Sequence, residues 1–165
     1  MRISGTGLQL VLAREGVRAR VYEDSGGKPT IGVGHLLTPA EVESGQIVIG
    51  GRPVSYGAGL TEAQIEALLS QDMAPVEAAL NQTVPSGLGQ PQFDALCSFV
   101  FNVGAGAWLY SGRNRSPCGV LRALLSGHPE DVPGQLMRWV HVGGQTDPGL
   151  VARRKGEVAQ WEGRP

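Results

Sequence analysis

The sequence predicts an α+β fold with a small β lobe near the N-terminus and a larger helical lobe. Alternating residues on both sides of a glycine-rich turn predict a β-hairpin between residues 17 and 33. In the helical lobe, apolar residues recur at helical spacing and are interrupted by Gly, Pro and Asn. A chain of 165 residues is enough for one domain with a sizeable core. We therefore expect a single domain over 1–165, with the β lobe at about 16–59 and the helical lobe at about 60–165 plus the N-terminal helix.

The first helix is predicted by its two ends and by its apolar spacing. Ser4 or Thr6 is suited to cap its start, and Gly16 is suited to the position just after its end. Glu15 therefore falls on its last turn. Its apolar residues are Leu8, Val11 and Leu12.

The hairpin is predicted from two strands, at 17–22 and 29–33, that flank the turn residues 24–27. The turn sequence Asp-Ser-Gly-Gly favours a tight reversal of the chain. Gly32 and Gly34 then indicate a bend or a close approach of the backbone.

Residues 38–59 are rich in Gly, Ser and Pro and predict a loop with one short helix or ribbon. Thr61 and Gln64 then form a capping box that starts a long helix. We expect this helix to run to about Leu80, with a kink at Pro75, and to join the two lobes. Its apolar stripe is Leu60, Ile65, Leu68 and Leu69. Further helices are predicted at 91–103, 107–112, 117–126, 132–140 and 148–161.

Composition and charge exclude several classes of function. The formal net charge is −1, so no basic field attracts nucleic acid or an anionic membrane. Cys97 and Cys118 have no Cys or His partner at the spacing of a zinc site, so we expect no metal and two reduced thiols, with a disulfide as the alternative. The apolar run in residues 1–14 is too short for a signal peptide or a membrane anchor.

The hairpin region also carries two carboxylates and a hydroxyl that suit the hydrolysis of a glycosidic bond. Glu15 lies at a helix end, where the dipole and an apolar environment both favour the protonated acid. Asp24 lies at a turn open to water and should stay ionised, and Thr30 across the hairpin can help it to hold one water. The alternative is ordinary: an Asp before Gly often only forms a turn, and a Glu at a helix end is often only solvated.

The arrangement of these residues is similar to a family motif. Glu15, eight residues, Asp24, five residues and Thr30 are followed directly by Ile-Gly-Val-Gly-His at 31–35. This segment resembles the phage-type lysozymes, which are endolysin muramidases of glycoside hydrolase family 24. The resemblance extends over nearly the whole chain, through segments 92–104, 138–144 and 149–157, and is weakest around Gly50–Gly59.

The resemblance implies a lysozyme-like fold, a general acid at Glu15, and a water positioned by Asp24 and Thr30. It implies no cofactor. It also implies a sugar-binding groove lined by Leu36, Phe101, Asn102 and Ser111. Each of these has a structural alternative: packing for Leu36 and Phe101, and helix capping for Ser111. Asn102, next to flexible glycines, is the best suited to contact N-acetyl and hydroxyl groups.

His35 invites a catalytic or metal-binding role, but the resemblance implies no acid–base or metal chemistry by a histidine there, and no second ligand lies at metal spacing. We therefore expect His35 to stabilise the fold by pairing with an acid such as Asp72 on the long helix.

The function that follows is hydrolysis, with inversion, of the β-1,4 bond between N-acetylmuramic acid and N-acetylglucosamine in peptidoglycan, for lysis of a phage host. The expected partner is the glycan strand alone, with no nucleic acid and no membrane anchor, and the protein is expected to be a monomer. We expect it in the host cytoplasm until it is released to the periplasm and wall. One alternative is a lytic transglycosylase, which needs no positioned water; another is a catalytically idle wall-binding component of the phage.

Overall fold

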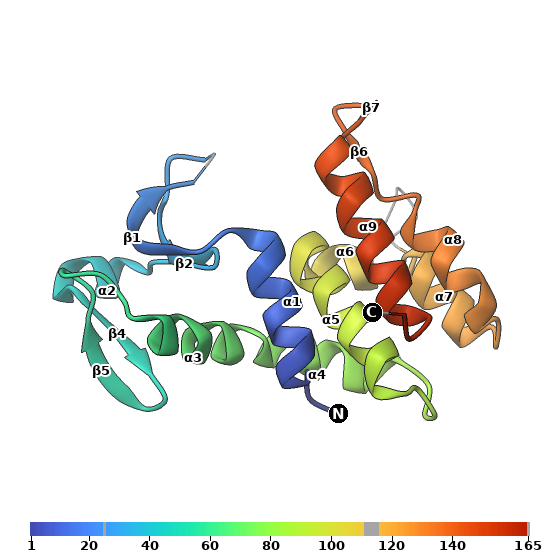
Figure 1. The fold of residues 1–165 in the computed structure, drawn as a ribbon, viewed down its shortest axis with the longest axis horizontal. Coiled ribbons are helices and arrows are strands. Elements are labelled where there is room, and N and C mark those ends of the chain that lie inside the picture. Colours follow the sequence, from blue (N-terminus) through green and yellow to red (C-terminus); the bar gives the residue numbers. More distant parts are fainter. Residues whose placement is uncertain (25, 111–115, 165) are drawn as a thin grey trace. The chain divides into compact units, whose positions relative to one another are not determined.

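The computed structural model describes residues 1–24, 26–110 and 116–164, and it has the predicted α+β class. The chain divides into two compact units. One unit is Leu8–Ala74, and the other combines Met1–Gly7 with Pro75–Pro165. The chain passes from one unit to the other inside the first helix and again at the start of the fourth (Figure 1).

The unit Leu8–Ala74 holds all the predicted β structure. A three-stranded antiparallel sheet has the order β1-β2-β3, and a separate two-stranded ribbon pairs β4 with β5. The predicted hairpin is confirmed, but the third strand was not predicted, because two residues show no periodicity. The elements are α1 (Gly5–Glu15), β1 (Arg18–Glu23), β2 (Pro29–Gly32), β3 (His35–Leu36), α2 (Pro39–Ser44), β4 (Gln46–Ile49), β5 (Arg52–Ser55) and α3 (Glu62–Asp72).

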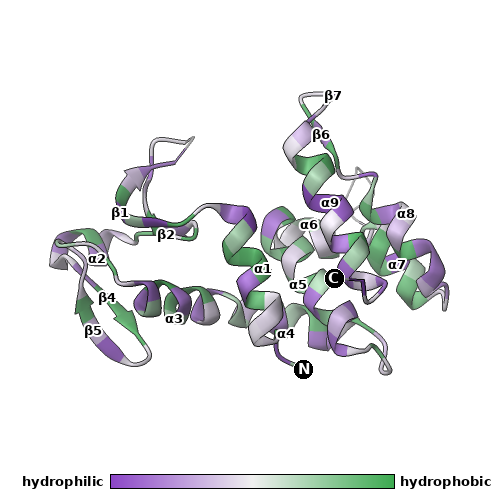
Figure 2. Ribbon diagram, viewed as in Figure 1, coloured by the Kyte–Doolittle hydropathy of each residue, from purple (hydrophilic) through white to green (hydrophobic). Residues whose placement is uncertain are grey.

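The predicted helix caps are confirmed. The Ser4 hydroxyl accepts a hydrogen bond from the Gly7 amide at 3.0 Å, so Ser4 rather than Thr6 caps α1. Thr61 and Gln64 form the capping box of α3. The apolar stripe expected on α3 is buried, and Figure 2 shows hydrophobic and hydrophilic residues alternating along this helix.

Residues 38–59 are more regular than predicted, because they form both a short helix and a ribbon. Thr38 and Glu41 make a capping box for α2. Gly50 and Gly51, both at positive φ, form the two-residue turn between β4 and β5. β4 alternates, with Ile47 and Ile49 buried and the residues between them exposed.

The prediction of one kinked helix from Thr61 to Leu80 is wrong. α3 ends at Asp72, and a separate helix, α4 (Ala74–Thr83), begins two residues later. Pro75 explains the break, because proline has no amide hydrogen to donate and its ring clashes with the carbonyl four residues earlier. Proline is tolerated in the first turn of a helix, and that is where α4 holds it.

The other unit is helical around α5 (Gln90–Val103), of which residues 93–100 are all buried. α9 (Pro148–Trp161) packs along α5, and both helices were predicted. The remaining elements are α6 (Ala105–Leu109), α7 (Gly119–Leu125), the 3-10 helix η1 (Pro129–Asp131), α8 (Val132–Leu136), β6 (His141–Val142) and β7 (Gln145–Thr146).

Two helix predictions in this unit need correction. The helix predicted at 107–112 begins earlier and ends at Leu109. The helix predicted at 132–140 ends at Leu136, and the chain then enters a hairpin of β6 and β7. Gly143 and Gly144, both at positive φ, make the turn of this hairpin. A favourable two-residue turn between short β segments thus outweighs the helical spacing before it.

The core of this unit contains a fully buried acid. Glu157 is 0% exposed and forms ion pairs with Arg153 and Arg154 at 3.3 and 2.7 Å. It also accepts a hydrogen bond from the Ser98 hydroxyl at 2.8 Å. The Arg154 guanidinium lies 4.9 Å from the centre of the Phe99 ring, a cation–π distance. A buried charge is tolerated only with such partners.

Both cysteines are buried free thiols, and burial raises the pKa of Cys97 and of Cys118.

No helix in the described part of the chain is both long enough and apolar enough to cross a membrane.

A buried carboxylate also holds the first residues of the chain against α5. Asp94 is 4% exposed and accepts hydrogen bonds from the Ser4 amide at 2.9 Å and from the Gln90 side chain at 2.7 Å. The α1 backbone passes so close to this group that a Cβ at Gly7 would lie 2.6 Å from the Asp94 Cγ. Glycine is therefore required at position 7.

We predict that Gly7→Ala destabilises the protein by about 1–3 kcal/mol, because a carboxylate fixed by its hydrogen bonds cannot move away from the new methyl group. Gly5→Ala is the matched control in the same helix, since a Cβ at Gly5 meets no atom within 4 Å. It should leave the stability unchanged or raise it by up to about 1 kcal/mol. Urea unfolding of both variants measures the difference, and equal stabilities would contradict the steric argument.

Candidate active site

The Asp24 carboxylate is built into the turn of the β1–β2 hairpin. Its Oδ1 atom accepts hydrogen bonds from the amides of Gly26 at 2.8 Å and Lys28 at 2.9 Å. The Asp24 amide in turn donates to the Lys28 carbonyl at 2.9 Å. Oδ2 receives no hydrogen bond from any described residue. One carboxylate oxygen therefore fixes the turn and leaves the other available.

Thr30 is held by the same peptide backbone. Its hydroxyl donates to the Lys28 carbonyl at 3.0 Å, and its side chain is buried, with 3% of the residue exposed. Because the hydroxyl proton is used in this bond, the oxygen lone pairs are left to accept. The main chain of Lys28 thus couples Asp24 and Thr30, the two residues expected to hold a water.

Glu15 is the last residue of α1 and is half-buried. Gly16 follows at φ +74°, which ends the helix as predicted. The residue therefore lies at the C-terminal end of the helix, which carries partial negative charge. Glu15, Asp24 and Thr30 all belong to the unit Leu8–Ala74.

The residues predicted to line a sugar groove are distributed over both units. Leu36 is 46% exposed and pairs with Thr30 across β2 and β3. Phe101 is half-buried and Asn102 is exposed, both on the last turn of α5. The Asn102 side-chain oxygen accepts a hydrogen bond from Arg154. Ser111 lies outside the described residues.

Sequence analysis missed two features of this site, the main chain of Lys28 and the position of Tyr22, because neither follows from the type of the side chain. The role of Lys28 comes from its main chain, which any residue would supply. Tyr22 pairs directly with Thr30 in the β1–β2 register, and only the register reveals this. The alternation of residues along a strand could have placed Tyr22 and Thr30 on one face. That inference needs the register of the two strands, which alternation alone does not give.

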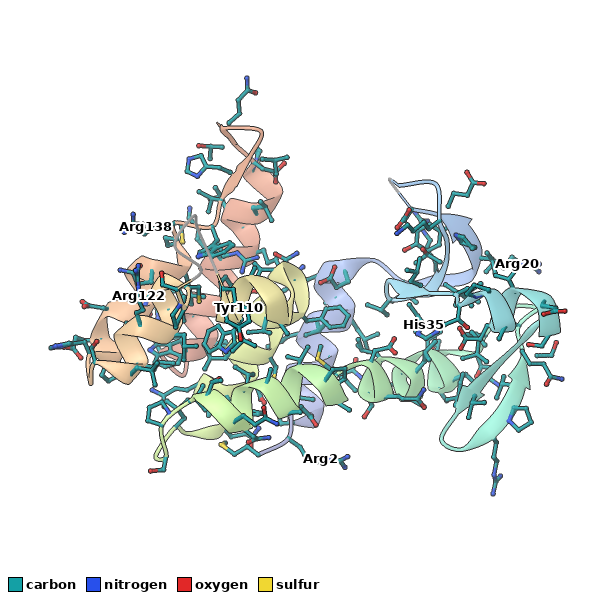
Figure 3. All side chains as sticks on the ribbon, turned by 180° about the vertical axis from the view of Figure 1, so that it is seen from behind. Arg2, Arg20, His35, Tyr110, Arg122 and Arg138 are labelled. Carbon is teal, nitrogen blue, oxygen red and sulfur yellow. The ribbon has the colours of Figure 1, made fainter. Side chains whose placement is uncertain are left out.

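His35 pairs with Asp72 as predicted. Its Nδ1 atom lies 3.0 Å from both carboxylate oxygens of Asp72 on α3, and Figure 3 shows the side chain beside this helix. Its Nε2 atom lies 3.6 Å from the Glu41 carboxylate on α2, an ion-pair distance beyond hydrogen-bond range. The side chain is 15% exposed. His35 therefore joins β3 to two helices.

These contacts shift the pKa of two groups. The hydrogen bond to Asp72 raises the pKa of His35 above its usual 6.5, and burial opposes this only in part. Burial of Glu41 favours its neutral form, but hydrogen bonds from Thr38 and the nearby His35 charge outweigh burial and lower its pKa below 4.5. In the described residues, no group of three His, Cys, Asp or Glu side chains is placed to hold a metal ion.

We predict a pH-dependent contribution of His35 to stability. Because the folded pKa is raised, its stabilisation is full below pH 6.5 and is lost as the pH rises through the folded value. The contribution of Glu41, whose pKa is lowered, is full above pH 4.5 and is lost as the pH falls through its folded value. His35→Asn should therefore lower the unfolding free energy most between these limits, by about 1.5–3 kcal/mol.

The measurement is thermal or urea unfolding of wild type and His35→Asn across this pH range. His128→Asn is the matched control, because His128 pairs with Glu130 on the surface, where both side chains are mostly exposed. A stability difference at His35 that does not change with pH would contradict the assignment.

Four matches to known proteins identify the family. A family model described as phage lysozyme matches residues 13–157. The endolysin of Acyrthosiphon pisum secondary endosymbiont phage 1 is 33% identical over 166 residues, which cover 98% of this chain and 99% of that protein. A crystal structure of a P22 lysozyme mutant has a TM-score of 0.78 at 33% identity and covers 98% of this chain and 99% of its own. The muramidase domain of SpmX from Asticcacaulis excentricus has a TM-score of 0.74 at 29% identity, over 97% of each chain. The chain belongs to the phage lysozyme family.

Proposed function

We propose that this protein is a phage endolysin that hydrolyses the β-1,4 bond between N-acetylmuramic acid and N-acetylglucosamine in peptidoglycan. The family supports a glycoside hydrolase acting on the bacterial wall. The observation that supports the hydrolytic mechanism is the coupling of Asp24 and Thr30 through the Lys28 backbone. This arrangement suits a site that holds one water.

In this mechanism, the water donates one hydrogen bond to the Thr30 oxygen and the other to Oδ2 of Asp24. Thr30 can only accept from it, because its own proton is bound to the Lys28 carbonyl. With both protons used in this way, a lone pair of the water is free to point toward the anomeric carbon of the sugar. Asp24 is then the general base that takes the proton.

Glu15 is the general acid on the other side of the bond. It transfers its proton to the glycosidic oxygen while that oxygen leaves the anomeric carbon. The water oxygen forms the new bond to carbon, and its proton moves to Asp24. The products are a new reducing end and a free hydroxyl on the leaving sugar. Glu15 ends as the anion and Asp24 as the acid, and exchange with solvent restores both.

Two other functions are less well supported. A lytic transglycosylase closes the sugar on itself and has no use for a water held by Asp24 and Thr30. A wall-binding component without activity has no use for a half-buried Glu15 at the motif spacing from Asp24 and Thr30. We further propose that the protein works as a monomer on glycan strands and reaches the wall from the host cytoplasm, and the endolysin relatives support action at the wall.

The stereochemistry of the first product tests the proposal. A single displacement gives the α-anomer, which NMR detects within minutes, before mutarotation. Mass spectrometry should show ordinary reducing ends. A β-anomer would indicate a covalent intermediate on Asp24, and anhydromuramic ends, one water lighter, would indicate transglycosylation. Glu15→Gln is the control and should lower turnover by at least about 10²–10⁴ through loss of the general acid.

Two substitutions at Asp24 separate its chemistry from its role in the turn. Asp24→Asn keeps an oxygen that accepts from Gly26 and Lys28, but it removes the base, so we predict a loss of about 10²–10⁴ in kcat with little change in stability. Asp24→Ala loses the same activity and, in addition, about 1–3 kcal/mol from the two missing hydrogen bonds. Turnover and urea unfolding measure the two effects. An Asp24→Asn protein with more than a tenth of the wild-type kcat would contradict the role as base.

A further inference from the structure

The three-stranded sheet has one face committed to packing. Ile31 pairs with His35 across β2 and β3, and these side chains share a face because residues directly opposite each other in an antiparallel pair point the same way. Ile31 is fully buried and His35 binds Asp72 of α3. This face therefore lies against α3.

The opposite face carries Thr30, which lies between two larger side chains. Tyr22 pairs with Thr30 from β1, and Leu36 pairs with it from β3. Asp24 lies two residues beyond Tyr22, on the same side of the strand by the two-residue period. Tyr22 is thus adjacent to both residues that hold the water, across the sheet in one case and along the strand in the other.

Tyr22 also differs from the rest of its strand. Five of the six residues of β1 are exposed, and Tyr22 alone is half-buried. Its hydroxyl makes no hydrogen bond to any described residue. A partly covered aromatic ring with a free hydroxyl, next to the reacting water, has an apolar surface and a polar end that a ligand can use.

We propose that Tyr22 binds the N-acetylmuramoyl ring whose anomeric carbon receives the water. The aromatic ring lies against the apolar C–H bonds of the pyranose, and the hydroxyl bonds to a polar substituent of the same sugar. Leu36 covers Thr30 from the other side. Tyr22 and Leu36 together keep bulk water from Thr30 while one sugar ring is bound over Thr30. This inference rests on the proposed function, since the water defines which sugar is bound.

Binding without turnover tests the role of Tyr22. In a Glu15→Gln background, titration calorimetry with soluble, uncrosslinked glycan oligomers of alternating N-acetylglucosamine and N-acetylmuramic acid gives Kd directly. Tyr22→Ala should raise Kd at least about tenfold, and Tyr22→Phe, which keeps the ring, about threefold. In the active enzyme the same variants should raise KM more than they lower kcat. Val21→Ala, the neighbouring exposed residue of β1, is the matched control and should change neither.

Thermal unfolding separates binding from folding. If Tyr22→Ala lowers the melting temperature, Tyr22→Leu is used as the test variant instead. A tenfold rise in Kd is still expected for Tyr22→Leu. A Kd within twofold of the parent for folded Tyr22→Ala or Tyr22→Leu would overturn the inference. If the wild type still hydrolyses the glycan and Glu15→Gln does not, the proposed function stands without the inference about Tyr22. If the wild type binds but does not hydrolyse, the function fails, and a raised Kd at Tyr22 still supports sugar binding.

Discussion

The candidate site depends on the hydrogen bonds made by the main chain of one residue, Lys28. Its amide holds Oδ1 of Asp24, and its carbonyl holds both the Asp24 amide and the Thr30 hydroxyl. These bonds fix the two side chains relative to each other through backbone atoms, which have fewer degrees of freedom than a contact between two side chains. A positioned water needs this precision, because small displacements from the reacting geometry are costly in rate. The turn that shapes the hairpin is therefore also what positions the two candidate side chains.

The sheet that carries this turn is small and depends on α3 for its stability, since short strands bury too little surface alone. Ile31 and His35 supply the contact, one by apolar burial and the other by a charge-assisted bond to Asp72. The second acid, Glu41, brings α2 to the same histidine. His35 lies between two carboxylates and has a raised pKa, so it stabilises this unit most when its imidazole is charged. The face that carries Thr30 is thus held in place by contacts on the opposite face of the sheet.

Sequence reasoning was most successful where local chemistry decides the structure. The capping residues Ser4 and Thr61, the turn after Asp24 and the pairing of His35 with Asp72 were all predicted, because each follows from a residue type at a given spacing. It failed where helical spacing continues past the point at which the helix ends. The break at Pro75 follows from backbone sterics, yet helical spacing continues through it. The hairpin after Leu136 depends on a glycine turn further along the chain.

The two-residue period of a strand separates the histidine of the motif from the face that carries Thr30. His35 and Leu36 are adjacent, but they point to opposite faces of the sheet. The register pairs His35 with buried Ile31 and Leu36 with Thr30. A histidine could reach the water only at position 36 or from another element, and there it would lose Asp72. The same argument separates Tyr22 from its immediate neighbours Val21 and Glu23, since Tyr22 is directly paired with Thr30 and adjacent strand residues point to opposite faces. In this short sheet, the two-residue period decides whether a side chain faces α3 or lies on the side of Thr30.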